Sequence, residues 1–140
     1  MPESTGVVLA ELISVVHRCS RTATLRLPEA LSPSAYRTLA LARDRGPVRL
    51  GELAELVRVS QPGMTKIVAA LSADGLLTRI ADPEDLRART VSITATGIEF
   101  LGDYARELGA ALTEEFADLS PDELTALANA TDILLSRLDR

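Results

Sequence analysis

Two short helical patterns joined by a brief turn constrain the fold of this chain more than any other feature of its sequence. The first runs from Leu50 to Val57 and the second from about Gln61 to Asp74, with a turn at residues 58–60 between them. Ser60 is a suitable N-cap for the second helix, and Gly75 is a suitable residue to end it. Together these signals predict a helix-turn-helix unit.

The second of these helices has one apolar face and one small, polar face. Residues at i, i+3, i+4 and i+7 form a stripe that we expect to be buried: Met64, Ile67, Val68 and Leu71. The opposite face carries no acid: Gln61, Pro62, Thr65, Lys66, Ala69 and Ala73. Small residues let a helix approach the major groove of DNA, while polar side chains near its N-terminus reach base edges. This face is therefore a candidate DNA contact surface, although Lys66, the only lysine of the chain, would also suit a solvated helix face.

Two strands and a long connection follow the second helix. The strands are expected at Leu77–Ala81 and Arg89–Thr94, and they flank the loop DPEDLRA, which is longer than a tight hairpin needs. In the second strand one buried face is expected from the alternation of Val91 and Ile93 with Thr90, Ser92 and Thr94. A helix-turn-helix followed by a long-tipped hairpin is a winged helix, and Arg87 and Arg89 lie where a wing meets the DNA backbone or the minor groove.

Further helical patterns precede this unit. A first helix is expected from near Thr5 to near Leu27, where Pro28 stops it, and a second opens at Ser32-Pro33 and ends at Gly46-Pro47. Apolar residues at helical spacing mark the faces that we expect to be buried: Val8, Leu12, Val15, Val16, Cys19 and Ala23 in the first helix, Tyr36, Leu39 and Ala40 in the second, and Leu53, Ala54 and Leu56 in the short helix that follows.

Two more helical patterns follow the hairpin. A long apolar stripe is expected on the helix after the second strand: Leu101, Tyr104, Ala105, Leu108, Leu112 and Phe116. Ser120-Pro121-Asp122-Glu123 is a well-formed start for a last helix, which carries Leu124, Leu127, Ala128, Leu134 and Leu138. One small domain has little core left to cover these helices and the first one, so we expect them to pair across the two-fold axis of a homodimer. Packing of the same helices within one chain is the alternative.

Composition and motifs limit the kind of protein. With 140 residues, 46% hydrophobic and 25% charged, the chain is expected to form one globular unit over residues 1–140. The apolar start is interrupted by Glu11 and followed by His17 and Arg18, so neither a signal peptide nor a membrane span is expected. A single cysteine makes no internal disulfide, which favours a cytoplasmic setting. One Cys and one His cannot form a Cys/His zinc site, and no nucleotide-binding or hydrolase motif is present, so we expect no metal, no cofactor and no enzyme activity.

The net charge of −5 is unevenly distributed. Residues 1–47 carry a net charge of +2, residues 48–94 carry 0 and residues 95–140 carry −7. The run from Val57 to Ala73 holds Arg58 and Lys66 and no acid, so the region around the second helix of the helix-turn-helix is locally positive. A pI near 4.9 therefore does not exclude a nucleic-acid partner, provided that the acidic C-terminal third faces away from it.

With these motifs, the chain resembles the multiple-antibiotic-resistance-regulator (MarR) family of transcription factors. The resemblance rests on the runs ELAELVRVSQPGMTKIVAALSADGLLTR and DPEDLRARTVSITATG, and the family's order of elements covers essentially all 140 residues. It implies a mainly α fold (an α+β winged helix), with a winged helix-turn-helix DNA-binding region at residues 30–95 and dimerisation helices at residues 1–28 and 96–140. It also implies a homodimer on double-stranded DNA, most often a repressor, whose DNA binding is weakened by a small, often aromatic ligand.

The resemblance also bears on individual residues. Those expected to contact DNA are Arg58, Ser60, Gln61, Pro62, Thr65, Lys66, Arg87 and Arg89. Lys66 stands where many relatives have Arg, so a phosphate contact or a flexible guanine contact is expected in place of a bidentate one. Arg87 matches the wing arginine of the family, and Asp85 would hold its side chain through a short charged hydrogen bond.

Ligand and redox hypotheses concern the first two helices. In relatives the ligand lies between the helix-turn-helix and the dimerisation helices, so His17, Arg21 and Tyr36 are candidates for binding an anionic or phenolic effector. The alternative is a core tyrosine and two surface charges. Some relatives sense peroxide through a cysteine of the first helix, and Cys19 lies on that helix with His17, Arg18 and Arg21 nearby, so a redox-sensing role for Cys19 is an alternative. A lone Cys on an apolar stripe is otherwise a small core residue.

A protein-interaction module is the alternative from a different functional class. Three acids in the wing and a single basic residue on the recognition helix would also suit a winged helix that binds a protein partner in place of DNA. In that case Asp82, Pro83 and Asp85 only form the turn, and Arg87 is a solvated charge.

Overall fold

The computed structural model describes residues 4–82, 84–85 and 87–138. Its elements follow in the order α1 (Thr5–Arg26), α2 (Pro33–Arg45), β1 (Val48–Arg49), α3 (Leu50–Val57), α4 (Gln61–Ala73), β2 (Leu77–Ala81), β3 (Arg89–Ile93), α5 (Ala95–Ala111) and α6 (Pro121–Leu138). This mainly helical chain with a small antiparallel sheet confirms the predicted winged-helix fold class. The short strand β1 was not predicted. Pro83, expected to form part of the wing turn, lies outside the described residues.

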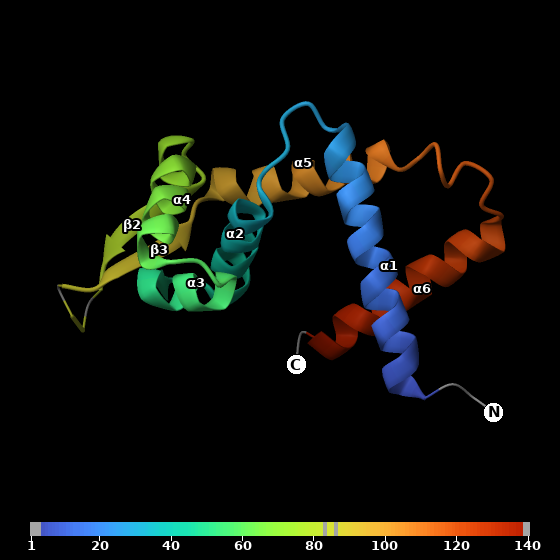
Figure 1. Ribbon diagram of the computed structural model, residues 1–140, viewed down its shortest axis with the longest axis horizontal. Helices are drawn as coiled ribbons and strands as arrows, with labels where there is room; N and C mark the ends of the chain where they lie inside the picture. Colours follow the sequence, from blue (N-terminus) through green and yellow to red (C-terminus); the bar gives the residue numbers. More distant parts are fainter. Residues whose placement is uncertain (1–3, 83, 86, 139–140) are drawn as a thin grey trace.

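The molecule has two ends joined by one helix (Figure 1). The helices α2, α3 and α4 and the sheet form one end, α1 and α6 form the other, and α5 runs from the sheet toward α1. Within the described ranges, no helix combines the length and the apolar character that crossing a membrane requires.

The helix boundaries follow from caps that the sequence encodes. The hydroxyls of Ser32, Ser60 and Thr94 accept hydrogen bonds from the backbone amides three residues further on, at 3.1, 3.1 and 3.0 Å. Ser120 and Glu123 form a reciprocal capping box, in which Glu123 Oε2 accepts from the Ser120 amide at 2.9 Å. These bonds confirm the predicted starts of α2, α4 and α6. They also end β3 at Ile93, because Thr94 is used as the N-cap of α5.

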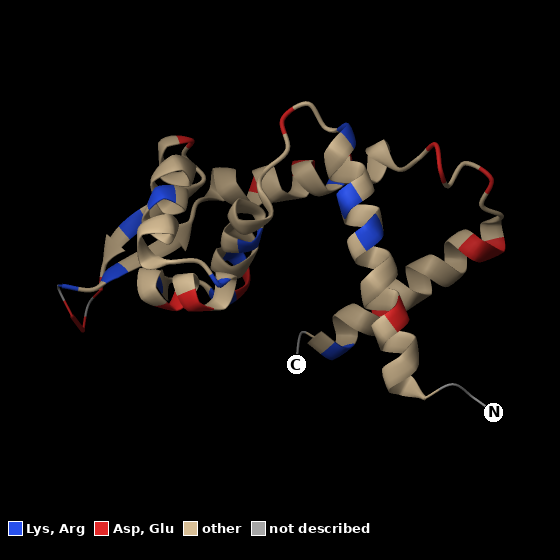
Figure 2. Cartoon of the chain, viewed as in Figure 1, with Lys and Arg blue, Asp and Glu red and all other residues tan. Residues whose placement is uncertain are grey.

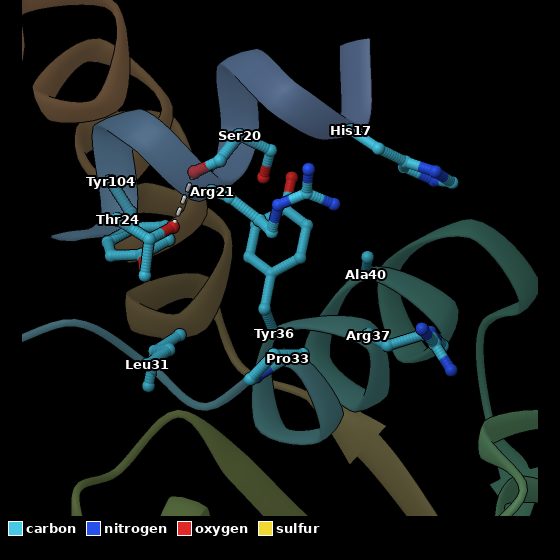
Figure 3. A pocket seen from close by; sticks show the side chains of 10 residues that line it. All are labelled: His17, Ser20, Arg21, Thr24, Leu31, Pro33, Tyr36, Arg37, Ala40 and Tyr104. Carbon is cyan, nitrogen blue, oxygen red and sulfur yellow. Dashed lines mark hydrogen bonds between the residues drawn. The ribbon is translucent and has the colours of Figure 1, made fainter. Parts of the chain in front are cut away.

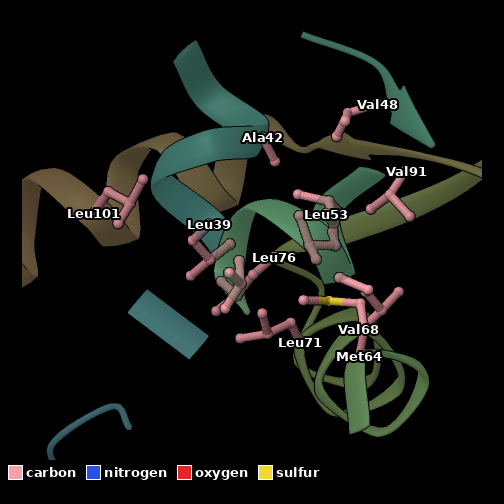
Figure 4. Packing of buried hydrophobic residues seen from close by; sticks show 13 residues of the cluster. Leu39, Ala42, Val48, Leu53, Met64, Val68, Leu71, Leu76, Val91 and Leu101 are labelled. Carbon is pink, nitrogen blue, oxygen red and sulfur yellow. The ribbon is translucent and has the colours of Figure 1, made fainter. Parts of the chain in front are cut away.

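The hydrophobic core joins the helix-turn-helix to the sheet and to the first half of α5 (Figure 4). Its buried residues are Leu39, Ala42, Val48, Leu53, Ala54, Val57, Met64, Val68, Leu71, Leu76, Leu77, Val91 and Leu101. The predicted stripe on α4 is confirmed, with Met64, Val68 and Leu71 buried and Ile67 half-buried against the same core. Because this stripe holds α4 against α3, the opposite face of α4 is left to the surface.

On α2 and α3, two residues predicted to be buried are exposed. The short helix α3 buries Val57, one turn after Leu53, and leaves Leu56 37% exposed because that side chain lies to the side of the buried face. Tyr36 is also 37% exposed, since it points from α2 toward α1 and not into the core.

The sheet has the strand order β1-β3-β2, with both pairs antiparallel. Thr90 lies opposite Arg49 on one side and opposite Ile80 on the other, so these three side chains share one face of the sheet. The expected alternation in β3 holds for Val91, but Thr90 is buried as well, with 7% exposure. The side chains of Arg49 and Asp82 lie beside it, around the same surface cavity.

The terminal helices bury little within the chain. Of the stripe predicted on α1 only Ala23 is buried, and α6 has no buried residue among those described. The stripe predicted after β3 is interrupted, because α5 ends at Ala111 and Phe116 lies in the turns that follow. The Arg26 guanidinium binds the Ala111 carbonyl at 2.8 Å and the Glu115 carboxylate, and so ties the end of α1 to this turn.

Candidate nucleic-acid interface

The recognition helix α4 presents the predicted residues on its outward face. Gln61, Pro62 and Lys66 are exposed, and Ser60 caps the helix through its hydroxyl. Thr65 is half-buried, and its hydroxyl donates to the Gln61 carbonyl at 3.0 Å. The N-terminal end of α4 therefore offers an amide side chain and a proline ring, and Lys66 adds a positive charge one turn further along.

Arg58 lies at the turn between α3 and α4. Its backbone adopts the left-handed conformation, with φ 60° and ψ 49°, and its amide donates to the Glu55 carbonyl at 3.2 Å. Among the described residues it is the one non-glycine residue with a positive φ. Its side chain is exposed at the start of α4, beside the other residues predicted to contact DNA.

The wing brings two arginines next to the start of α4. Arg87, Arg89 and Gln61 line one surface hollow of about 400 Å³, which also includes Arg49 from β1. Figure 2 shows basic residues on α4, on the strands and in the wing, with acidic residues on α3 and at the wing tip. The structure thus places predicted groove-contacting residues from two separate elements around one concavity.

The expected side-chain bond from Asp85 to Arg87 is not formed. Asp85 Oδ1 instead accepts from the Arg87 backbone amide at 2.9 Å, and the ion pairs among the described residues do not include this pair. Asp85 therefore shapes the backbone of the wing and leaves the Arg87 side chain exposed. A carboxylate two residues before an amide favours this local turn over a contact with a long side chain.

Asp82 is a wing residue whose role the sequence analysis missed. Its Oδ2 accepts from Arg49 Nε at 2.8 Å, and its Oδ1 accepts from the amides of Glu84 and Asp85 at 2.9 and 3.4 Å. The backbone amide of Glu84 and the Arg49 guanidinium lower the pKa of the Asp82 carboxyl, because both stabilise its charged form. The turn propensity of Asp82 is visible in the sequence, but its partner 33 residues away is not.

A second cavity lies between α1, α2 and α5 and includes all three candidate effector-binding residues (Figure 3). It has a volume of about 380 Å³, with His17 and Arg21 on α1 and Tyr36 on α2. Tyr104 of α5 also lines it, with its ring centroid 5.7 Å from that of Tyr36. Tyr104 was expected only as part of an apolar stripe. Cys19 lies half-buried on α1 and is not among the lining residues.

One residue connects this cavity with the helix-turn-helix. Arg37 lines the cavity, and its Nη1 donates to the Val57 carbonyl at 3.3 Å, at the end of α3.

No group of three or more His, Cys, Asp or Glu side chains with metal-binding geometry occurs among residues 4–82, 84–85 and 87–138.

Comparisons with known proteins agree with this geometry. Residues 31–88 match the sequence model of the MarR family. An HTH-type transcriptional regulator of Mycobacterium tuberculosis is 31% identical over 140 residues, which cover 99% of this chain and 98% of the relative. The structure of a transcriptional regulator from Thermotoga maritima aligns with a TM-score of 0.73 at 25% identity, over 97% of this chain and 96% of that one. A mutant of MarR from E. coli in complex with operator DNA aligns with a TM-score of 0.59 at 22% identity, over 92% and 94% of the two chains.

Proposed function

The chain belongs to the MarR family of transcriptional regulators, and from this premise we propose that it is a homodimeric repressor that binds an operator in double-stranded DNA and is released by a small aromatic or anionic ligand. The observation that carries the DNA-binding part is the hollow shared by Gln61, Arg87 and Arg89. When α4 lies in a major groove, a wing beside its N-terminal end reaches the flanking backbone and minor groove.

The homodimer is supported by the apolar residues that α1 and α6 leave at the surface. The exposed ones on α1 are Val7, Val8, Leu9, Ile13, Val15, Val16 and Leu25, and those on α6 are Leu124, Leu127, Ile133, Leu135 and Leu138. Large apolar side chains exposed in such number on two helices favour an interaction site. A second copy supplies the same two helices, so an isologous contact would bury both sets at once and set two recognition helices on one duplex.

Ligand release is supported by the cavity between α1, α2 and α5. Arg21 offers a positive charge to an anion, His17 offers a hydrogen bond, and the rings of Tyr36 and Tyr104 offer aromatic contact. Because the cavity lies between the winged helix and α1, a ligand in it would favour one relative placement of the two over the other. By linkage, that preference would change the affinity for DNA.

The test is selection of bound fragments from a pool of genomic DNA, followed by release of the best fragment with benzoate and 4-hydroxybenzoate. We expect enrichment of one or a few sites and release by at least one of the two acids, with the response lost in Arg21→Ala. If fragments are enriched but neither acid nor a wider set of aromatic anions releases them, DNA binding stands and ligand release does not. No enrichment at all would favour the protein-interaction module.

A further inference from the structure

The strongest unassigned feature of the winged helix is the ion pair between Arg49 and Asp82. Arg49 is the last residue before α3, and Asp82 is the first residue after β2, where the wing begins. Arg49 Nε and Asp82 Oδ2 lie 2.8 Å apart, and the Asp82 side chain is 9% exposed. One contact therefore joins the helix-turn-helix to the base of the wing.

This ion pair crosses the sheet. Arg49 is paired with Thr90 in β3, and Thr90 is paired in turn with Ile80 in β2. Asp82 follows Ile80 by two residues, so Arg49 reaches over the central strand to the far edge of the wing. The buried Thr90 lies on the same face, and a cavity at this point is lined by all three residues, Arg49, Thr90 and Asp82.

The second oxygen of Asp82 organises the wing itself. Oδ1 accepts from the amides of Glu84 and Asp85, and Asp85 in turn accepts from the amide of Arg87. A continuous chain of bonds thus leads from Arg49, at the start of α3, to the backbone of Arg87. These bonds connect Arg49, in the edge strand β1, with the backbone of the wing at Arg87.

We propose that Arg49 and Asp82 are positioning residues for DNA binding, which fix the wing at the angle where Arg87 reaches the duplex while α4 lies in the major groove. This inference rests on the DNA binding proposed above. Its physical basis is preorganisation, since a wing held in place before binding pays less ordering entropy on the duplex. Neither residue needs to touch DNA for this role.

Direct phosphate contact by Arg49 is the competing explanation. Among the described residues, Asp82 Oδ2 is the one hydrogen-bond partner recorded for the Arg49 guanidinium, and the side chain is 53% exposed in the hollow shared with Gln61 and Arg87. A direct contact and a positioning role both predict that loss of Arg49 weakens binding. The two explanations differ in one respect: only a positioning role makes the affinity lost with Arg49 depend on the presence of Asp82.

The test is a double-mutant cycle with Arg49→Gln and Asp82→Asn, measured as operator affinity by fluorescence anisotropy at several salt concentrations. Both substitutions introduce uncharged side chains that resemble the original ones in shape. The glutamine keeps part of the aliphatic chain of Arg49, and the asparagine keeps an oxygen that accepts from the Glu84 amide. We expect each single variant to bind about tenfold more weakly and the double variant to bind no more weakly than either single one.

The salt dependence supplies a readout that a purely structural role would not move. Each single variant should lower the slope of log K against log salt by the same step as Arg87→Ala, about 0.9 for one lost phosphate contact. Adding Arg49→Gln to Arg87→Ala should then cost little further affinity. Arg106→Ala is the matched control, because it removes the same charge and breaks the exposed pair with Asp103 on α5; it should bind as the wild type does.

Hydrogen exchange in the free protein keeps the inference testable if a variant binds poorly for other reasons. Arg49→Gln should speed exchange at the Glu84 amide, because the carboxylate that accepts from it is no longer held. Unchanged exchange together with unchanged affinity would overturn the inference. Additive losses of affinity in the double-mutant cycle would also overturn it, because they would indicate that Arg49 contacts a DNA phosphate directly and independently of Asp82. Failure of the wild-type protein to bind any duplex would overturn the proposed function as well.

Discussion

Arg58 holds a backbone conformation that an L-amino acid with a side chain adopts at a cost, next to the recognition helix. Glycine is the favoured residue at such a helix end, so we expect Arg58→Gly to raise the free energy of unfolding by about 0.5–1 kcal/mol. The same change should weaken operator binding and lower the salt slope by about 0.9, because a phosphate contact is lost. Urea unfolding and anisotropy titrations measure the two effects. Arg58→Lys should keep the wild-type unfolding free energy and the wild-type operator affinity. If Arg58→Gly binds the operator as tightly as the wild type does, Arg58 does not contact DNA.

Arg87 and Gln61 should affect binding in different ways, although they line the same hollow. Arg87→Ala should weaken binding to operator and to unrelated DNA alike and lower the salt slope, because a wing arginine contacts backbone and minor groove. Gln61→Ala should change which operator bases are preferred and leave the salt slope in place, since a base-edge contact releases no counterion. Selection from a randomised operator library measures base preference, and titrations at several salt concentrations measure the salt slope. Together they distinguish the effect of Arg87→Ala from that of Gln61→Ala. Equal effects on sequence preference would contradict these assignments.

Asp82 gives the wing a defined response to acid. Its pKa is lower in the folded protein than in the unfolded chain, so its contribution to stability is complete above the unfolded value of about 3.9 and is lost as the pH falls through the folded value. The difference in unfolding free energy between the wild type and Asp82→Asn should therefore be constant between about pH 7 and pH 5 and shrink below about pH 4. Urea unfolding at a series of pH values measures it, and a difference that grows toward acid would contradict the sign.

At the scale of elements, the junction of β3 and α5 depends on one glycine. A Cβ atom at Gly97 would lie 2.3 Å from the Leu76 carbonyl oxygen and 2.7 Å from Ile93 Cγ1, so Gly97→Ala must displace backbone. We expect it to lower the free energy of unfolding by about 1–3 kcal/mol, or more if the strand moves. Gly109→Ala is the matched control in the same helix, because nothing lies within 4 Å of its added Cβ. It should raise stability by about 0.5–1 kcal/mol. Equal effects of the two variants would contradict the packing at Gly97.

The elements that the sequence predicted well are those defined by local chemistry. Ser32, Ser60 and Ser120 mark helix starts because a cap is a contact between residues three apart. The apolar stripe of α4 was predictable for the same reason, since its period is local. The fold class, including the wing, followed from the order of these elements, and the small, acid-free face of α4 already suggested a DNA contact. The family resemblance added the homodimer, the ligand and the match of Arg87 to a wing arginine.

The features that the sequence did not predict depend on contacts between distant residues. Thr90 is buried beside the Arg49–Asp82 pair, and no pattern within β3 contains that information. The carbonyl of Ala111, the last residue of α5, accepts from Arg26, which lies 85 residues earlier. Asp85 was predicted to bind the side chain of Arg87, but it accepts from the backbone amide of Arg87. A short carboxylate reaches a nearby amide more readily than a long side chain. Which residues contact DNA or ligand stays a prediction.

At the scale of the whole molecule, the winged helix and the exposed apolar helices lie at opposite ends (Figure 1). Basic residues lie on α4 and the wing at one end, and the acidic turn between α5 and α6 lies toward the other (Figure 2). The exposed apolar residues of α1 and α6 also lie away from the wing (Figure 1). This arrangement would let two copies join through α1 and α6 while both wings remain free for one duplex.

Association through these helices can be tested without DNA. Leu127→Glu and Ile13→Glu place a charge on apolar positions that are 51% and 57% exposed in the single chain. Each should shift the protein from dimer to monomer in sedimentation equilibrium, because an unpaired charge is costly in a buried interface. Operator affinity should fall at least about tenfold, since one protomer then binds one half-site. Ile80→Glu, on an exposed apolar residue of β2, is the control and should remain dimeric. A dimer that survives both α1 and α6 variants would contradict the assignment.

The most direct measurement of the central claim is a titration of the purified protein into labelled duplex that carries the DNA upstream of its own gene. A scrambled duplex of the same composition serves as the control, and both are titrated at several salt concentrations. A DNA-binding regulator predicts tight, saturable binding to the natural duplex, much weaker binding to the scrambled one, and a log K that falls linearly with log salt. Equally weak binding to both duplexes, with no tighter site in pooled genomic fragments, would contradict it.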